Sequence, residues 1–289
     1  MKKSLYLLFI SLFLVNSSIY AQCDWWVKSY GGELADNVTA MEVDDAGNVY
    51  ITGSFSGSAD FGDISVTSYG DKDVFVAKIN KDGVPVWVKN AGGIYEDEAN
   101  DIAIDNNGNI YITGYYNSTA TFGAESITSS GGEDLFIVKY SNSGSFSWVI
   151  SGGSYDNYST SDDIGHSINF SGSQLYVSGR NVDYMLSGAD TTVLGINYNN
   201  FLGKINTDGS IDSAKIVYYN GYDEFLSKVD NNGNVYVTGH FSNKINLAGD
   251  ELVSNGGNDV FLAKYNENLE CLWVKKMGVV VTKMLILFI

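Results

Sequence analysis

Three short acidic runs have residue types that could bind a ligand. They read DDAGN, DNNGN and DNNGN and begin at Asp44, Asp105 and Asp230. Their oxygen-bearing side chains resemble those of a calcium loop, which needs several converging oxygen ligands and a distal glutamate. Here glycine follows one position after the second candidate ligand, and no distal acid is present. The runs therefore favour tight hairpin turns, in which Asn and Gly tolerate positive φ.

The remaining candidates for chemistry do not form a recognised constellation. His166 and His240 are the only histidines, and neither has a cysteine or second histidine at metal-ligand spacing, so each is interpreted as a solvated or packed residue. No G-x-S-x-G nucleophile elbow is present. Glu96, Asp97 and Glu98 are carboxylates of the kind that flank a glycosidic bond, but glycosidase chemistry needs two carboxyls at a defined separation. The sequence thus predicts no metal, no cofactor and no catalytic residue.

A repeat of 60 to 65 residues predicts the strands and turns that position these residues. The stretch DNNGNIYITG at 105–114 has counterparts that start at residues 44, 170 and 230. A fixed period of this size marks a repeat architecture. Each unit has four predicted strands, a to d, with the acidic turn between a and b. Strand c carries a phenylalanine three residues before a lysine, at Phe75, Phe136, Phe201 and Phe261.

Four antiparallel strands per unit predict the blade of a β-propeller. Strand b is almost continuously apolar, as expected for a strand covered on both faces. The strand-b tyrosines, the strand-c phenylalanines and the tryptophans should pack between blades. The predicted fold is therefore all-β, a β-propeller of four-stranded antiparallel blades with four units present and the ring incomplete. The predicted blades span about 37–91, 98–151, 162–217 and 223–276, after a lone d strand at 23–30.

The unit from Trp87 to Trp148 carries a family resemblance. Its pattern W-V-K…GG…D…I-A-I-D-x-x-G-N-I-Y-I-T-G…F-G…D-x-F-x-x-K…W resembles the bacterial SBBP-type β-propeller repeat. Weaker copies extend the likeness over about residues 25–278. The resemblance implies an exported propeller, often one module of a larger cell-surface protein. It implies no shared catalytic residues.

Both ends of the chain depart from the repeat. Residues 1–21 combine Lys2 and Lys3 with an apolar run and a small-residue cleavage site, which predicts a signal peptide and a secreted or cell-surface protein. Residues 278–289 replace the expected glycines and strand a with an aberrant apolar tail. One hypothesis is a frameshift that truncates a longer propeller. The alternative is an apolar strand that caps the last blade, since twelve residues are too few to span a membrane.

The charge balance narrows the class of partner. The chain has 17 Lys and Arg against 34 Asp and Glu, a net charge of −17. Nucleic acids and anionic membranes bind clustered Lys and Arg, so neither is a predicted partner. A protein or glycan ligand is predicted instead, with no transmembrane segment after signal cleavage. Cys23 and Cys271 can form one disulfide in an oxidising compartment, but the sequence does not decide whether they do.

The predicted ligand-binding face carries the long b–c and d–a connections, because binding residues concentrate in loops on a rigid scaffold. Equivalent repeat positions form a ring, so the residues after the strand-b glycines should share that face. These residues are Ser54, Tyr115, Arg180 and His240. The longer d–a loop of the third unit adds Tyr155, Asp156, Tyr158, Asp162 and Asp163. A solvated rim is the alternative for both sets.

The sequence predicts a binding module without catalytic activity of its own. Two alternatives stay open. One is a glycan-active hydrolase or lyase that uses acids on the long-loop face. The other is a truncated fragment of a larger surface protein, with no function of its own.

Overall fold

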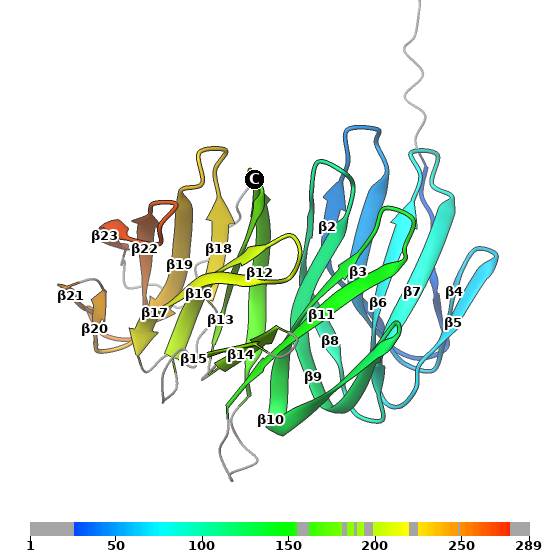
Figure 1. The fold of residues 1–289 in the computed structure, drawn as a ribbon, viewed down its shortest axis with the longest axis horizontal. Helices are drawn as coiled ribbons and strands as arrows, with labels where there is room; N and C mark the ends of the chain where they lie inside the picture. Colours follow the sequence, from blue (N-terminus) through cyan, green and yellow to red (C-terminus); the bar gives the residue numbers. More distant parts are fainter. Residues whose placement is uncertain are drawn as a thin grey trace, which may run out of the picture.

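The computed structural model describes residues 26–154, 162–180, 184–187, 190–193, 199–219, 225–247 and 249–277. Within these ranges the regular elements are β-strands, and none is a helix. The strands form four consecutive antiparallel blades in chain order, from blue in the first blade to red in the fourth (Figure 1). The fold is therefore all-β, a β-propeller of four-stranded blades whose ring is incomplete.

Each blade contains strands a, b, c and d in sequence order. Blade 1 contains β2 (Asp36–Val43), β3 (Val49–Phe55), β6 (Asp73–Ile79) and β7 (Pro85–Gly93). Blade 2 contains β8 (Glu98–Ile104), β9 (Ile110–Phe122), β10 (Glu125–Tyr140) and β11 (Phe146–Gly153). Blade 3 contains β12 (Ile164–Ser171), β13 (Gln174–Arg180), β16 (Asn199–Asn206) and β17 (Ile211–Tyr219). Blade 4 contains β18 (Phe225–Val229), β19 (Val235–Phe241), β22 (Asp259–Tyr265) and β23 (Cys271–Met277).

Each b–c connection contains a β-hairpin that the sequence analysis treated as a loop. In blade 2 the hairpin consists of the distal halves of β9 and β10. The other hairpins are β4 (Ser58–Phe61) with β5 (Ile64–Thr67), β14 (Tyr184–Ser187) with β15 (Asp190–Val193), and β20 (Lys244–Leu247) with β21 (Asp250–Val253). Strand β7 pairs with β9, β11 with β14, and β1 (Gly31–Gly32) with β4. The end of each of these d strands is thus joined to the hairpin of the following blade.

The hydrophobic core lies in layers between neighbouring blades. One layer contains Tyr50 and Val76 of blade 1 with Ile102 and Phe136 of blade 2. Corresponding layers lie between blades 2 and 3 and between blades 3 and 4. The strand-c phenylalanines are at most 2% exposed, which confirms their predicted packing role. Apolar area buried on both faces of each blade is the main stabilising contribution expected for such a stack.

The acidic runs form hairpin turns, as predicted. Asp105 Oδ1 accepts hydrogen bonds from the amides of Asn107 and Asn109, at 2.8 and 2.9 Å. Its Oδ2 accepts from Asn109 Nδ2 at 2.7 Å and from Tyr111 Oη at 3.0 Å. In blade 3 the alignment of Phe170 with these aspartates is wrong. Phe170 pairs with Leu175 inside the hairpin, so this turn is one residue shorter than the others.

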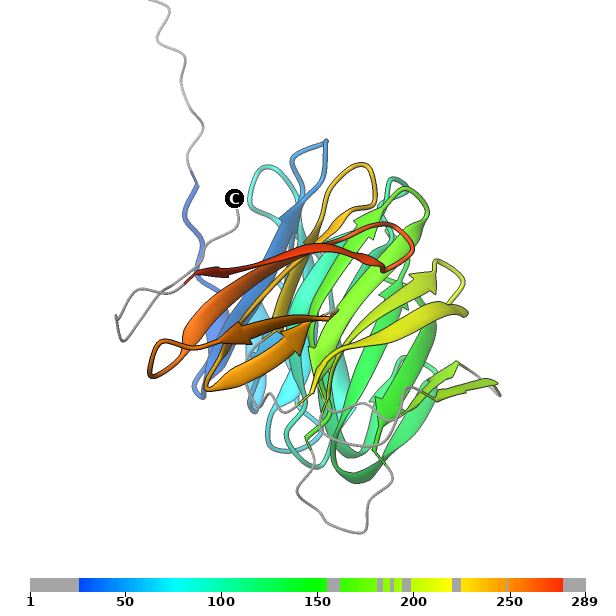
Figure 2. The ribbon, with the colours of Figure 1, turned by 90° about the vertical axis from the view of Figure 1, so that its left-hand side faces the viewer.

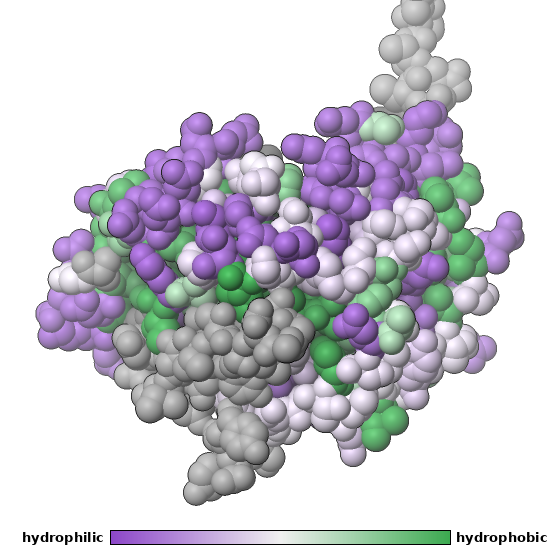
Figure 3. Space-filling model, in the orientation of Figure 1, coloured by the Kyte–Doolittle hydropathy of each residue, from purple (hydrophilic) through white to green (hydrophobic). Residues whose placement is uncertain are grey.

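The blades are stacked through their inner strands. Strand β2 lies beside β8, β8 beside β12, and β12 beside β18. Figure 2 shows this stack with blade 4, in orange and red, toward the viewer. The a–b and c–d turns lie in the upper half of the molecule in Figure 1, and hydrophilic residues concentrate along the upper edge in Figure 3.

Several predictions on the chain ends fall on residues outside the described ranges. These include the predicted signal peptide, Cys23 and residues 278–289. Residues 26–30 of the predicted lone d strand have no strand assignment, and pairing starts at Gly31. Within the described ranges, no helix is long and apolar enough to cross a bilayer.

Candidate functional site

A pocket of about 460 Å³ lies where the inner strands of all four blades converge. We call it the axial pocket. Strand a of every blade contributes to it, and Tyr115 and Arg180 enter from strand b of blades 2 and 3. The lining residues are Thr39, Asn100, Tyr115, Ile164, His166, Arg180 and Leu226.

Three of the lining residues are the extra residue of a β-bulge. The pairing of strands a and b shifts at Thr39, Asn100 and His166 in blades 1, 2 and 3. A bulge leaves one residue unpaired and redirects its side chain, and bulges are frequent beside functional sites. Blade 4 has regular pairing here, and Leu226 lines the pocket from an unbulged strand. The bulges therefore account for the polar side chains at equivalent places in three blades.

The glycine near the end of strand b makes this arrangement possible. A Cβ atom on Gly114 would overlap the carbonyl oxygen of Glu98 in strand a. Gly53 and Gly179 meet the same obstacle, at Asn37 and Ile164. The backbone of strand a thus crosses close over the glycine in blades 1 to 3, which explains the glycine of their ITG and VSG motifs.

Hydrogen bonds from the bulge residues join neighbouring blades. Thr39 Oγ1 donates to the carbonyl oxygen of Ala99 at 2.6 Å. One blade further along, Asn100 Nδ2 donates to the equivalent carbonyl, that of Gly165, at 2.9 Å. Each bond links a polar wall residue to the inner strand of the next blade. The wall of the axial pocket is therefore stabilised by hydrogen bonds between side chains of one blade and the backbone of the next.

A charged cluster borders the pocket beside Tyr115. Lys72 Nζ lies 2.8 Å from Glu98 Oε2 and 3.8 Å from Glu96 Oε2. Tyr115 Oη donates to the same Glu98 oxygen at 3.3 Å. Burial lowers the pKa of Lys72, but the hydrogen bond and charge of Glu98 outweigh it, so the pKa is raised. Burial, and then the charge of Glu98, raise the pKa of Tyr115, which therefore stays protonated.

A second charged group lies beside Arg180. Its guanidinium is 4.0 Å from Asp162 Oδ2. Burial, followed by the charge of Asp162, raises the pKa of Glu133 to about 7, although Arg180 acts in the opposite direction. Glu133 therefore changes protonation near neutral pH, and the charge at this edge of the pocket depends on pH in that range.

The structure brings together two of the four predicted ring residues. Tyr115 and Arg180 both line the axial pocket. Ser54 is only 2% exposed within β3, and His240 is half-buried in β19. Neither is among the residues that line this pocket. Equivalent repeat positions therefore differ in their access to the pocket.

The acids predicted in the third d–a loop have separate positions. Asp162 lies at the pocket edge beside Arg180. Asp163 is fully buried and accepts from the amide and hydroxyl of Ser154, at 3.0 and 2.8 Å. This bonding gives Asp163 a structural role at the start of blade 3, in place of the predicted ligand contact. The remaining candidates, Tyr155, Asp156 and Tyr158, lie outside the described residues.

The sequence analysis missed the contribution of strand a. Thr39, Asn100 and Leu226 share no chemistry, so residue type gives no signal. His166 was interpreted as a solvated or packed residue, and it lies in the pocket wall. The strand-b glycines gave a partial signal, because strand a bulges beside Gly53, Gly114 and Gly179 but pairs regularly beside Gly239. Across the described ranges, no three His, Cys, Asp or Glu side chains are grouped as metal ligands.

These features define a β-propeller repeat module with a pocket at its inner strands. The family model described as SBBP, beta-propeller repeat, matches residues 86–119, from strand d of blade 1 into strand b of blade 2. The match supports the predicted repeat type.

Two curated relatives are similar to most of the chain. An uncharacterized WD repeat-containing protein of Acanthamoeba polyphaga mimivirus is 24% identical over 240 residues, covering 69% of this chain and 17% of that protein. The regulatory protein FlaEY of Caulobacter vibrioides is 26% identical over 214 residues, covering 66% of this chain and 22% of the relative. The chain spans about a fifth of the length of these relatives.

Proposed function

We propose that the chain is a secreted or cell-surface interaction module that binds a protein or glycan in the axial pocket, without catalysis of its own. The observation that carries the proposal is the convergence of four inner strands on one pocket containing Tyr115 and Arg180. The match to a propeller repeat and the likeness to a WD repeat-containing protein support an interaction role. The predicted signal peptide at 1–21 supports export.

The lining chemistry suits a ligand with several hydrogen-bonding groups. Arg180 offers a planar set of donors, and Asn100 and Thr39 offer an amide and a hydroxyl. The bordering acids Glu98 and Glu133 disfavour a polyanion. Neutral glycans and peptides with hydroxyl, amide or basic groups fit this combination. This is consistent with the net charge of −17.

Binding of the purified chain to a glycan array and a peptide array tests the proposal. At least one class should bind saturably, and Arg180→Ala should weaken that binding at least tenfold. Lys89→Ala is the charge-matched control, because Lys89 is exposed on the outer strand β7. Its affinity should stay within twofold of the unchanged chain. Equal binding by both variants, or no ligand on either array, would refute the proposal.

A glycan-active enzyme is the second candidate, favoured by one observation. The pKa of Glu133 is raised to about 7, and the negative charge of Asp162 contributes to this rise. A protonated acid near a carboxylate is the arrangement that glycoside hydrolysis uses. A polysaccharide panel separates the two candidates. Turnover that Glu133→Gln abolishes would establish the enzyme, whereas saturable binding without turnover supports the interaction module.

A further inference from the structure

Residues 26–32 take the place that strand d of a preceding blade takes at the interior junctions. Trp26 Nε1 donates to the carbonyl oxygen of Lys81 at 3.0 Å. Sixty-one residues later, Trp87 Nε1 donates to the equivalent carbonyl of Asn142 at 3.1 Å. Trp148 makes the corresponding bond in the next blade. The three indoles therefore have the same position relative to the blade that follows each of them.

The backbone beyond Trp26 repeats the same geometry. Gly32 N donates to Asp36 Oδ2 at 2.7 Å, as Gly93 N donates to Asp97 Oδ2 at 2.7 Å. Strand β1 pairs with the hairpin of blade 1, as β7 pairs with that of blade 2. Residues 26–32 thus occupy the place of a strand d, without strands a, b and c of the same blade within the described ranges.

Strand a of blade 1 exposes apolar side chains beside this strand, whereas Phe75 and Ala77 of strand c are buried in a cluster with Tyr30. Val38 and Met41 in β2 are 55% and 64% exposed. Their counterparts in blade 2, Ala99 and Ile102, are 0% and 1% exposed because blade 1 covers them. Val43 is also exposed, at 53%. We call the surface formed by Val38, Met41, Val43 and residues 26–32 the leading face.

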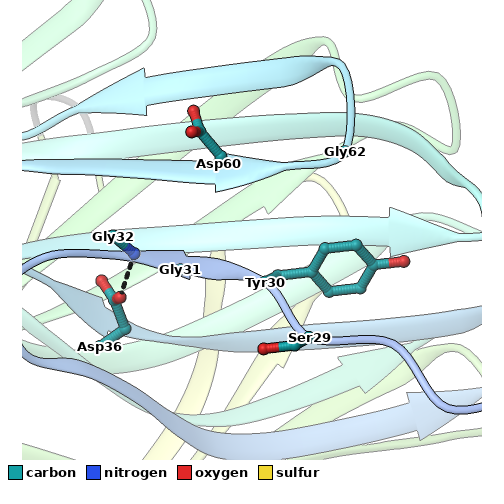
Figure 4. Close-up of a pocket in the computed structure, with 7 residues that line it drawn as sticks. All are labelled: Ser29, Tyr30, Gly31, Gly32, Asp36, Asp60 and Gly62. Carbon is teal, nitrogen blue, oxygen red and sulfur yellow. Dashed lines mark hydrogen bonds between the residues drawn. The ribbon is translucent and has the colours of Figure 1, made fainter.

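A pocket of about 420 Å³ lies at the outer part of the leading face (Figure 4). Gly31, Asp36 and Asp60 line it, and the Asp36 carboxylate points toward Gly32. At the interior junction the counterpart of Gly31 is Gly92. Asp73, the first residue of strand c, lies so close to Gly92 that a Cβ there would be 2.7 Å from its carboxyl carbon. The pocket thus corresponds to the place that a strand-c aspartate takes between complete blades.

We propose that the leading face is an interaction site for a three-stranded antiparallel sheet of the same repeat, contributed by another polypeptide. Its strand c pairs with residues 26–32 and places its first aspartate in the pocket beside Asp36. The site accepts strands a, b and c and excludes a strand d, because residues 26–32 already hold that place. A second copy of this chain does not fit by simple docking, since each of the four described blades contains its own strand d.

The three interior junctions support this assignment by continuity. At each interior junction, one blade carries the face that corresponds to the leading face of blade 1. A layer of buried apolar residues joins that face to the preceding blade. Pairing with an added strand would also give hydrogen-bond partners to the backbone N–H and C=O groups along an unpaired strand edge. The proposal concerns a different surface from the axial pocket, so either can fail without the other.

The test uses the full chain and a soluble carrier fused to residues 33–79, which contain strands a, b and c of blade 1. Binding should be saturable with one probe per chain, and Met41→Asp in the full chain should weaken it at least tenfold. Leu272→Asp is the matched control, because Leu272 is 53% exposed in blade 4. Its affinity should stay within twofold. A probe of residues 33–93, which adds strand d, should bind at least tenfold more weakly.

Other occupants of the leading face give different results. If the chain alone is a dimer that Met41→Asp dissociates, a second copy occupies the face and the proposal is wrong. If the probe binds only after deletion of residues 278–289, that segment of the chain occupies the face, which also overturns it. Equal binding of the two probes would show that residues 26–32 do not hold the place of strand d.

A tethered variant guards against a probe that fails to fold. Residues 33–79 are joined to the end of the chain by a flexible linker long enough to reach the leading face. The thermal midpoint should rise above that of the unmodified chain, and Met41→Asp should remove the increase. An unchanged midpoint in the tethered variant, together with no binding of the separate probe, would overturn the proposal.

Discussion

Asp44 has the side chain of a candidate metal ligand, but its carboxylate accepts hydrogen bonds from the backbone of its own turn. Its carboxylate accepts from the amides of Ala46 and Asn48, at 3.0 and 2.8 Å, and from Asn48 Nδ2 at 2.8 Å. Tyr50 Oη adds a bond of 3.1 Å. Burial raises the pKa of Asp44, but these hydrogen bonds outweigh it and lower the pKa below its usual value. The residue therefore stabilises the turn in its ionised form.

Asp44→Ala should lower the free energy of unfolding by about 1 to 3 kcal/mol, because several donors lose their acceptor. Its neighbour Asp45 provides the control, since it is exposed in the same turn. Asp45→Ala should change stability by about 0.5 kcal/mol or less. Urea unfolding of the two variants checks this. Equal losses would contradict the role assigned to Asp44.

Two buried glycines predict effects of opposite sign. Gly114→Ala should destabilise the chain by about 1 to 3 kcal/mol, because the new methyl group overlaps the carbonyl of Glu98. Gly203→Ala meets only ordinary contacts, with Phe201 Cε2 at 3.6 Å, so it should be neutral or stabilising by up to about 1 kcal/mol. Thermal unfolding distinguishes the two. A stable Gly114→Ala variant would show that strand a does not cross closely over the glycine.

At the scale of elements, buried aspartates at the starts of strands a and c accept hydrogen bonds from backbone amides of adjacent segments. Asp97 accepts from the amides of Gly93 and Asn117, at 2.7 and 3.0 Å. Asp73 and Asp134 each accept one backbone amide through Oδ2. Their Oδ1 atoms are buried without a hydrogen-bond partner in the described part of the chain. Burial raises the pKa of Asp73 to about 6 and that of Asp97 and Asp134 to about 7.

These shifts predict that stability falls as the pH rises from about 4 to about 7. The folded pKa values lie above the usual aspartate value of 3.8, so folding favours the protonated form. The stabilisation is complete below the unfolded pKa and is lost as the pH passes through about 6 to 7. The expected loss is about 1 to 3 kcal/mol by urea unfolding. Asp134→Asn should flatten this dependence, and an unchanged slope would contradict the assignment.

The sequence predicted which elements exist better than where they end. Alternation in strand a and the DNNGN turns located the hairpins, because both patterns are local. The bulges at Thr39 and Asn100 were not predictable from residue type, since they arise from a backbone crossing over Gly53 and Gly114. The hairpins inside the b–c connections were also missed. Their pairing partner is strand d of another unit, which local sequence does not reveal.

At the scale of the whole molecule, the repeat period determines most of the architecture. The incomplete ring follows from four units and a lone strand d, and the exposed Met41 marks its first open face. The candidate site was less predictable. Tyr115 and Arg180 were found from their repeat position, but Ser54 at the same position is buried. The repeat thus predicts position around the axis, whereas side-chain access depends on the packing of each blade.

Hydrogen–deuterium exchange tests the central claim most directly, using the glycan or peptide that binds most tightly on the arrays. The account predicts slower exchange on binding in the a and b strands that line the axial pocket, at 98–101, 113–116 and 164–168. Exchange at the turns 44–48, 105–109 and 230–234 should stay unchanged. Protection confined to those turns, or absent from the inner strands, would contradict an axial binding site.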